Sequence, residues 1–287
     1  MNYAEAAKAR FKKVFGRDLN LENPTTFNEK LLYLNLSLSS DDMMTRARYT
    51  DKLRVRDVFK EKLGEDIGIP IKAVYDRSVD LHTIQVEGPH VIKCTHGFGM
   101  NFFFDGHLTT KQIKEIQASL HVTWSKKNFE EWYKFIDHKL ILEEKLPGEI
   151  RDVHVLCFNG TALVYEEPIF PVKPGRIFDE DGYPNEEFSL STDTHISYYD
   201  KDWNFMMDVV RARVPSIVET PSTAPANLDT IKTYAETLAD GFKFMRVDFI
   251  ISGEKVYGEK IVFSPTGGFS PFLGDGDTIL GNMLTVR

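Results

Sequence analysis

The chain has 287 residues, of which 42% are hydrophobic and 27% charged, which is typical of a folded globular protein and excludes a disordered or fibrous class. Its formal net charge is −8, so no global positive field favours nucleic acid, and any phosphate binding must depend on a few locally placed cations. Two cysteines, Cys94 and Cys157, are too few for a disulfide framework or a zinc knuckle, and no run approaches the roughly 18 apolar residues of a membrane span. We therefore expect a cytoplasmic protein with no transmembrane segment and no nucleic-acid partner.

The N-terminal part of the chain predicts helices. Apolar residues at helical spacing indicate a helix over residues 4–15, and Thr26 with Glu29 forms the capping-box pattern that opens a second helix. Residues 41–63 indicate one longer helix, which carries a dense run of charged residues at 51–56. Taken alone, such a run is typical of the solvated face of a helix.

A lysine inside an apolar strand marks the next feature. Lys93 lies in the predicted strand at 90–95, directly before the glycine-containing loop at 96–101. Lysine is seldom buried without a partner, and a glycine loop can turn backbone N–H groups toward an anion. Together they predict a phosphate-binding element, with Lys93 as the cation and the loop as the cradle. A lone Gly-x-Gly is weak evidence because turns use glycine widely, and His96 is more typical of a structural histidine than of a catalyst.

The middle of the chain alternates helical and strand patterns. Residues 110–120 and 128–136 predict helices, and residues 139–146 (KLILEEKL) predict an apolar strand. Residues 168–202 are rich in Pro, Gly, Asp and Glu and predict a lid or an irregular insertion, and residues 203–210 predict a short helix.

An Asn-Gly pair between two β-rich runs is the strongest hairpin signal in the sequence. Asn159 and Gly160 separate strands expected at 152–158 and 161–166. Asp152 and His154 are two residues apart on the first strand and therefore share one face.

The most informative stretch is a second predicted hairpin at 244–264, FMRVDFIISGEKVYGEKIVFS. Arg246 and Asp248 leave the same face of its first strand, and Glu259 lies at the far end of its second. Two carboxylates converging beside an arginine are costly to bury unless a cation lies between them, and Mg²⁺ carrying a polyphosphate is a natural occupant. The alternative is a solvated polar face on an amphipathic hairpin.

These features follow one another in an order that resembles the ATP-grasp superfamily, whose familiar members include D-alanine–D-alanine ligase. More closely, the chain resembles the TupA-like branch, named for teichuronopeptide synthesis and associated with bacterial surface polysaccharides. The matching stretches are FGRDLNLENPTTFNEKLLYLNL, DKLRVRDV, HVIKCTHGFGMN, LILEEKL, DVHVLCFNG, YYDKDW and FKFMRVDF…VYGEKIVFSPTGGFSPF, and they run from about residue 11 to the C-terminus.

The resemblance implies an α+β fold of the ATP-grasp type, in which two α+β subdomains hold ATP between antiparallel sheets. Residues 1–80 would form a helical N-terminal segment. Residues 81–145 would form the small subdomain with the glycine-rich flap, and residues 146–287 the large subdomain with the metal and acceptor sites.

The resemblance also implies which residues bind ATP. Lys52 and Lys93 would reach the nucleotide phosphates, and the loop at 96–101 would cover them. The remaining residues implied in ATP binding are the loop residues His96, Gly97 and Gly99, the adenine-reading hinge of Glu144, Lys145 and Leu146, and Asp152 near the ribose or phosphates.

A reaction centre is implied by the same resemblance. Asp248 and Glu259 would hold Mg²⁺, and Arg246 would stabilise the transferring phosphoryl group. Lys93 and His154 would be the other catalytic residues, although histidine is a weaker fixed charge than lysine or arginine because it titrates near neutrality.

One position departs from the family pattern. The metal strand of the family often reads Glu-x-Asn or Glu-x-Thr, whereas Glu259 is followed by Lys260 and Ile261. Isoleucine cannot ligate a metal. One metal ion would therefore lose a ligand at Ile261, unless water or Ser264 replaced it. Strand alternation predicts that Lys260 points to the opposite face from Glu259 and Ile261.

The function that these expectations favour is an ATP- and Mg²⁺-dependent ligase that joins a carboxylate to an amine through an acyl phosphate. Its substrates would be a carboxylate-bearing sugar or polysaccharide precursor and an amine such as an amino acid or amino sugar. Alternatives are a kinase that phosphorylates a sugar hydroxyl and a catalytically decayed nucleotide-binding protein. Phe269 and Phe272 could stack on a sugar, or they could equally be packing residues of their loop.

Overall fold

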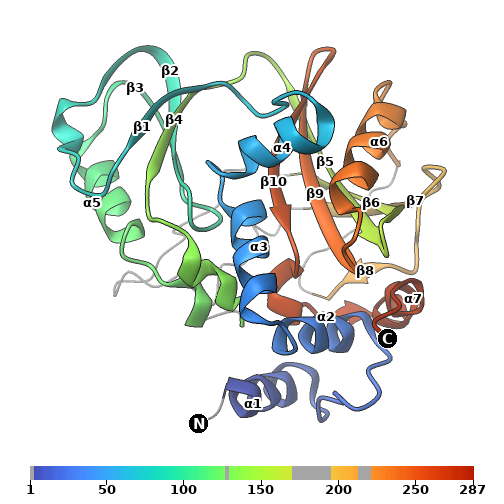
Figure 1. Ribbon diagram of the computed structural model, residues 1–287. Coiled ribbons are helices and arrows are strands. Elements are labelled where there is room, and N and C mark those ends of the chain that lie inside the picture. The colour runs from blue at the N-terminus through green and yellow to red at the C-terminus, as the bar shows by residue number, and fades with distance from the viewer. Residues whose placement is uncertain (1–2, 127–128, 170–194, 213–220) are drawn as a thin grey trace.

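The computed structural model describes residues 3–126, 129–169, 195–212 and 221–287 (Figure 1). It combines N-terminal helices with a four-stranded and a five-stranded antiparallel sheet, which confirms the expected α+β class. In Figure 1 the four-stranded sheet lies at the left and the five-stranded sheet at the right. None of the helices in these described ranges is long and apolar enough to span a membrane.

The N-terminal helices are α1 (Tyr3–Phe15), α2 (Phe27–Leu36), α3 (Ser40–Thr50) and α4 (Val55–Leu63). The capping box of Thr26 and Glu29 at the start of α2 is confirmed. The single helix predicted over 41–63 is wrong, because the chain turns between α3 and α4. There the buried carboxylate of Asp51 accepts the backbone N–H of Leu53 at 2.8 Å, and this local bond replaces helical hydrogen bonding.

The four-stranded sheet has the order β1-β4-β2-β3. Its strands are β1 (Ile71–Tyr75), β2 (Gln85–Cys94), β3 (Asn101–His107) and β4 (Leu140–Glu144). The helix predicted at 110–120 is confirmed as α5 (Thr110–Ser119), and it packs on this sheet through buried Ile113 and Ile116. Of the helix predicted at 128–136, the described part forms a 3-10 turn, Glu131–Phe135. Strand β1 lies within the expected segment 1–80, yet it pairs with β4 of the expected segment 81–145.

The five-stranded sheet has the order β10-β9-β5-β6-β7. Its strands are β5 (Ile150–Phe158), β6 (Thr161–Ile169), β7 (His195–Asp200), β9 (Phe244–Ser252) and β10 (Lys255–Val262), and a small separate pair is formed by β8 (Val210–Arg211) and β11 (Phe272–Leu273). Both predicted hairpins are confirmed. Asn159 and Gly160 have φ angles of 51° and 84°, the left-handed conformations that a two-residue hairpin turn requires.

The segment predicted as an insertion and a helix is partly strand. The last two residues of β6 and the whole of β7 lie in the range 168–202, and residues 170–194 lie outside the described residues. The helix predicted at 203–210 is wrong. The Asp200 carboxylate accepts the N–H groups of Asp202 and Asn204 at 2.9 and 2.8 Å and thereby holds a turn.

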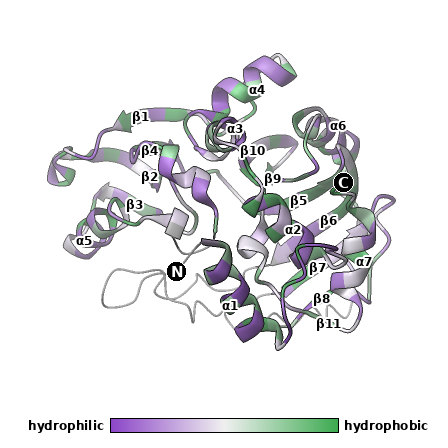
Figure 2. Ribbon diagram, turned by 60° about the horizontal axis from the view of Figure 1, so that its bottom comes forward, coloured by the Kyte–Doolittle hydropathy of each residue, from purple (hydrophilic) through white to green (hydrophobic). Residues whose placement is uncertain are grey.

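The two faces of the five-stranded sheet have different surroundings. Val153, Val155 and Val247 alternate onto one face and join a core with α6 (Leu228–Ala239), α3 and α4. On the other face, Leu156, Phe158 and Phe244 pack against α2 and α7 (Gly276–Met283). Figure 2 shows β5 and β9 largely in the hydrophobic colour, which agrees with a sheet covered on both sides.

Gly258 is the point at which β10 touches α4 and the chain before β1. Its N–H donates to the carbonyl of Ile67 at 2.9 Å, and a Cβ at this position would lie 2.8 Å from Phe59 and 2.9 Å from Ile67. A side chain here therefore overpacks the contact between the helices and the large sheet.

We predict that Gly258→Ala lowers the free energy of unfolding by about 1–3 kcal/mol, because buried ring and methyl groups must move to admit the methyl group. Urea denaturation measures the change. Glu254→Ala, in the exposed turn of the same hairpin, is the control and should change stability by less than about 0.5 kcal/mol. Equal effects of the two substitutions would contradict the tight approach at Gly258.

Candidate functional site

A row of polar side chains crosses the whole five-stranded sheet. Strand pairing places Lys260 opposite Asp248, Asp248 opposite His154, His154 opposite Glu166, and Glu166 opposite Tyr198. Directly paired residues of antiparallel strands project to the same face. These five residues therefore form one continuous row, here called the charge row.

Arg246 neutralises the centre of the charge row. Its Nε and Nη2 donate to the two oxygens of Asp248 at 2.7 and 2.8 Å, and its Nη1 donates to Glu166 at 3.2 Å. Asp248 is fully buried, so a bidentate guanidinium partner is what makes its charge tolerable. Burial alone would lower the pKa of Arg246, but Asp248 and Glu166 outweigh it and raise that pKa.

Glu166 is a second buried anion, and it has cationic and hydroxyl partners on all sides. Its carboxylate is 3.0 Å from Nδ1 of His154, accepts from Nη2 of Arg211 at 2.9 Å and accepts from the Tyr198 hydroxyl at 3.1 Å. Burial would raise the pKa of Glu166, but the positive charges of Arg211 and Arg246 hold it well below its ordinary range. The carboxylate is therefore ionised and orients the imidazole of His154.

Glu166, Tyr198 and Arg211 were not predicted as site residues from the sequence. Counting outward from the Asn-Gly turn would pair His154 with Tyr165, but an irregularity between Leu156 and Cys157 shifts the register by one residue. That shift brings Glu166 onto the face of His154. No signal in the sequence locates it.

A second bulge overturns the expectation for Lys260. Regular pairing after Gly258 would place Glu259 opposite Asp248, but the register shifts there and Lys260 takes that position. The Lys260 Nζ lies 3.3 Å from Asp248 Oδ2 and 3.7 Å from Glu259 Oε2, so Lys260 and Glu259 meet at one site instead of on opposite faces.

Ile261 is consequently not on the face where a metal ligand was expected. It pairs with Val247 and is buried in the core on the other side of the sheet. The proposed substitute Ser264 is also engaged, because its hydroxyl donates to Glu130 at 3.1 Å.

Neighbouring charges shift the pKa values of Glu259 and Lys260 at the bulge. Burial would raise the pKa of Glu259, but the positive charges of Lys260 and Lys93 outweigh it and lower that pKa to about 2. Burial would lower the pKa of Lys260, but Glu259 and Asp248 outweigh it and raise that pKa. Both groups are therefore charged at neutral pH.

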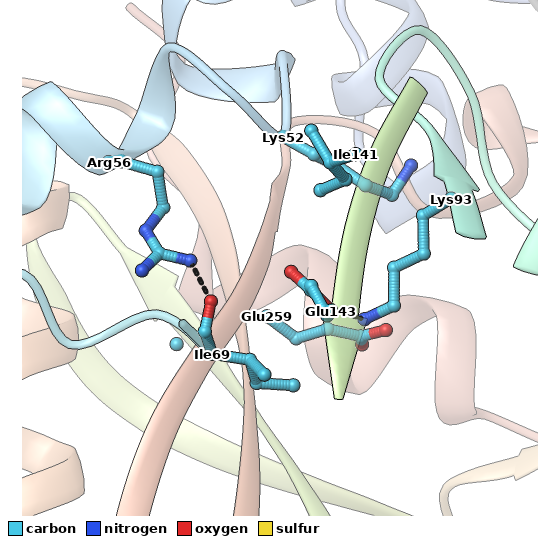
Figure 3. Close-up of a pocket in the computed structure, with 8 residues that line it drawn as sticks. Lys52, Arg56, Ile69, Lys93, Ile141, Glu143 and Glu259 are labelled. Carbon is cyan, nitrogen blue, oxygen red and sulfur yellow. Dashed lines mark hydrogen bonds and ion pairs between the residues drawn. The ribbon is translucent and has the colours of Figure 1, made fainter. Parts of the chain in front are cut away.

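A pocket lies where the two sheets meet, beside Glu259 (Figure 3). It is lined by Lys52, Arg56, Ile69, Lys93, Ile141, Glu143, Gly258 and Glu259. The buried Lys93 Nζ is 2.8 Å from Glu143 Oε2 of the neighbouring strand β4. Arg56 donates to Asp66 at 2.6 Å and to backbone carbonyls, so its guanidinium is already held.

Lys52 enters the pocket region because of the turn between α3 and α4. Its backbone N–H donates to the Thr95 carbonyl at 3.3 Å. Its Nζ donates to the Cys94 carbonyl at 2.9 Å and also to the Gly97 carbonyl. Burial and, to a smaller extent, the positive charge of Lys260 lower the pKa of Lys52 to about 8. The Lys52 ammonium donates to two backbone carbonyls, so a bound anion would add a negatively charged partner.

The glycine loop is held against an aromatic residue. A Cβ on Gly97 would lie 1.9 Å from Nε1 of Trp124, and the ring of Phe98 lies 4.1 Å from that of Trp124. Gly99 has a left-handed φ of 71°. Both glycines are therefore required by the path of the loop.

The His96 side chain belongs to the core below that loop. Its Nε2 lies 3.1 Å from the Ser119 carbonyl, and its ring stacks on His138 with centroids 3.6 Å apart. Burial and the neighbouring His138 lower the pKa of His96 to about 3. The imidazole is thus a neutral structural group, and only the backbone of His96 is left for the role implied in nucleotide binding.

The remaining predicted residues lie in β4, in the segment that follows it and in β5. Residues 145–149 join β4 of one sheet to β5 of the other, and the Lys145 N–H donates to Pro89 at 3.0 Å. Glu144 is exposed and pairs with Lys72 at 2.6 Å. Asp152 precedes His154 on the same face, and burial and the negative charge of Glu259 raise its pKa to about 6. Leu146 follows in the same connecting segment.

Of the two roles left open for Phe269 and Phe272, sugar stacking or packing, the structure shows packing. Phe269 is buried against Phe129, with the Arg10 guanidinium 4.5 Å from its ring centroid. Phe272 packs edge-on against Phe27 and Tyr198.

These side chains fit a polyphosphate better than a protein-bound Mg²⁺. The pocket lysines and Arg246 supply the charge that phosphates require. Asp248 and Glu259 are suitable oxygen donors, but Arg246 contacts both Asp248 oxygens and the Lys260 ammonium lies within 4 Å of both carboxylates. Across the described ranges, no three or more His, Cys, Asp or Glu side chains form a metal-binding group. In this arrangement the pair does not fit a shared metal ion.

Comparison with known proteins gives a family match over most of the chain. A family model described as TupA-like ATPgrasp matches residues 29–285. A comparison with curated proteins finds no match.

Solved structures with a similar fold include three amino-acid ligases. D-alanine–D-alanine ligase from Bacillus anthracis is 12% identical, with 85% of this chain and 67% of that chain covered and a TM-score of 0.43. L-amino acid ligase from Bacillus licheniformis is 13% identical, with 92% and 56% covered and a TM-score of 0.46. D-alanine–D-alanine ligase from Coxiella burnetii is 11% identical, with 91% and 67% covered and a TM-score of 0.43. The chain thus spans 56% to 67% of the lengths of these proteins.

The charge row generates a stability prediction. Glu166→Gln should lower the free energy of unfolding by about 3–5 kcal/mol at pH 7, because two buried arginines lose their shared carboxylate. Glu149→Gln, an exposed position, should have almost no effect. The double variant Glu166→Gln/Arg211→Met should lose less than the sum of its single variants, since the stranded charge is removed.

The ionised state of Glu166 also predicts how the free energy of unfolding changes with pH. The folded-state pKa of Glu166 is depressed, so its stabilisation is present above the unfolded pKa of about 4.5 and is lost as pH falls through the folded pKa. Denaturation between pH 7 and 3 should therefore show a shallower acid loss in Glu166→Gln than in the wild type. Identical acid slopes would contradict an ionised Glu166.

Proposed function

This chain belongs to the TupA-like ATP-grasp family, and we propose that it is an ATP-dependent ligase that joins a carboxylate to an amine. The observation that carries the proposal is the convergence of cations from two sheets. Lys52 and Lys93 come from the side of the four-stranded sheet, and the charge row with Arg246 comes from the five-stranded sheet. An acidic chain has concentrated buried cations at one place, as a bound polyanion requires.

The proposed nucleotide site lies at the pocket in Figure 3. Lys52 and Lys93 would donate to the phosphates of ATP, and the backbone of the 96–101 loop, with Gly97 and Gly99, would cover them. The connecting residues Glu144, Lys145 and Leu146 are proposed as the adenine hinge, and Asp152 as a ribose or phosphate neighbour. Mg²⁺ is proposed as the ion that the nucleotide phosphates carry with them.

The proposed chemistry has two displacements. A carboxylate oxygen of the acceptor attacks the γ-phosphorus of ATP, and the bond to the β,γ-bridging oxygen breaks to release ADP. An amine nitrogen then attacks the acyl carbon, phosphate leaves and the nitrogen loses a proton. The side chains supply position and charge rather than covalent chemistry.

Three residues would neutralise the negative charge that develops in the first displacement. Arg246 is rigid because Asp248 and Glu166 both accept from its guanidinium. Lys93 is held by Glu143, and His154 is oriented by Glu166. Groups fixed before the reaction lose little free energy to reorganisation during it.

The proposed substrates are a carboxylate-bearing sugar or polysaccharide precursor and an amine, an amino acid or an amino sugar. Membership of the TupA-like branch supports a role in making bacterial surface polysaccharides. The packed positions of Phe269 and Phe272 leave the sugar to be recognised by other groups.

We predict that Lys52 makes ATP binding pH-dependent. With a pKa of about 8 in the free protein, Lys52 is largely neutral at pH 9.5, and phosphate contact favours its charged form, so binding takes up a proton. Calorimetric affinity for Mg·ATP should fall by up to about tenfold per pH unit above pH 8. The matched Lys52→Arg variant, which stays charged, should lack this fall. If the wild type bound Mg·ATP with the same affinity across this pH range, the proposed contact of Lys52 with the phosphates would be contradicted.

We also predict the products. With a carboxylated sugar and an amine, the wild type should release ADP and form an amide in equal amounts, measured by mass spectrometry. Lys93→Met should lower the rate by about a hundredfold or more, in line with the loss of one charge-stabilising donor. Lys111→Met, on the exposed face of α5, should keep the wild-type rate. Phosphorylated acceptor without amide would instead support a kinase, and ATP binding without any ADP release would support a decayed enzyme.

A further inference from the structure

We propose that the ammonium group of Lys260 is a built-in cation that takes the place of a divalent metal ion between Asp248 and Glu259. The two carboxylates would then bind the side-chain ammonium of Lys260 instead of a metal ion. A bound nucleoside triphosphate would meet that fixed positive charge beside Asp248 and Glu259. The inference deepens the proposed nucleotide site and rests on it.

Backbone geometry is the first support. The bulge after Gly258 puts Lys260 opposite Asp248 and within reach of Glu259, where a regular strand would have turned Lys260 away. Lys260 Nζ is 3.3 Å from Asp248 Oδ2 and 3.7 Å from Glu259 Oε2. A single cation therefore contacts both carboxylates expected to share a metal.

The local charge balance is the second support. Asp248 already has the guanidinium of Arg246 on both oxygens and the Nε2 of His154 at 3.6 Å. A divalent ion at the same carboxylate would stand close to the permanent cations Arg246 and Lys260, and like charges at such distances repel strongly in a buried site. Lys260 and Arg246 together balance the two carboxylates, and the single charge of Lys260 is repelled less by Arg246 than a divalent ion would be.

The reach of Lys260 is the third support. Asp248 is fully buried, whereas the Lys260 side chain keeps 24% of its surface exposed. An ammonium group has three N–H donors, and within the described part of the chain the Lys260 ammonium has two carboxylate neighbours. A phosphate oxygen can therefore approach the same ammonium, which would act on a triphosphate as a fixed cation does.

The proposal is tested by counting bound Mn²⁺ in place of Mg²⁺, using electron paramagnetic resonance of the full chain. Without nucleotide, the wild type should bind no Mn²⁺ at this pair, whereas Lys260→Met should bind one, because both carboxylates lose their shared cation. Glu259→Gln added to Lys260→Met should abolish that ion. Lys260→Arg, which keeps the charge, and Lys255→Met, an exposed lysine on the same strand, should behave as the wild type does.

A second arm uses the non-hydrolysable triphosphate AMP-PNP. Removing divalent ions with EDTA should weaken its binding to the wild type by less than about tenfold and to Lys260→Met by more than about a hundredfold. In saturating AMP-PNP, Lys260→Met should hold one Mn²⁺ more than the wild type. Circular dichroism confirms that each variant is folded, and Lys260→Gln replaces Lys260→Met if the latter is not.

The outcomes separate the two claims. Equal Mn²⁺ counts in the wild type and in the folded Lys260 variants would overturn the built-in cation and leave the nucleotide site standing. Failure of the wild type to bind AMP-PNP with or without Mn²⁺ would overturn the nucleotide site and the inference with it. An extra Mn²⁺ in Lys260→Met that survives Glu259→Gln would also overturn the inference, because it would lie elsewhere.

Discussion

Two buried carboxylates and the cations that neutralise them are the constraint on which the rest of this structure depends. Asp248 and Glu166 lie on one face of the five-stranded sheet, and Arg246 donates to both. Ionised groups can be buried only when each has a close partner, so the strands must keep the register that brings these side chains together. The opposite face of the same sheet is ordinary apolar core, which holds that register in place.

Local breaks in regular structure complete the site. Asp51 ends α3 early and turns Lys52 toward the glycine loop, where its ammonium donates to Cys94 and Gly97. The bulge after Gly258 brings Lys260 onto the charge row. At both places a residue leaves the helical or strand pattern, and at both places a lysine is delivered to the junction of the two sheets. The structure thus uses irregular backbone where it gathers charge, and regular strands where it builds the core.

Much of this arrangement could be predicted from the sequence, and the rest depends on long-range register. The hairpin at Asn159 and Gly160 and the capping box at Thr26 follow from local chemistry, so short windows sufficed to predict them. The order of motifs was enough to predict the family. Lys260 and Glu166 were misplaced or missed because a shift of one residue reverses which face a side chain occupies. The pairing of β5 with β9 joins residues almost a hundred positions apart, and no local pattern reports it.

We propose that the charge row and the pocket lysines together form one polyphosphate site. A crystal structure of the full chain with AMP-PNP and Mg²⁺ would show whether they do. We expect the phosphate chain between the two sheets, within hydrogen-bonding distance of Lys52 and Lys93 on one side and of Arg246 or Lys260 on the other. A triphosphate bound elsewhere on the protein, with the pairs of Lys93 to Glu143 and Lys260 to Asp248 unchanged, would contradict it.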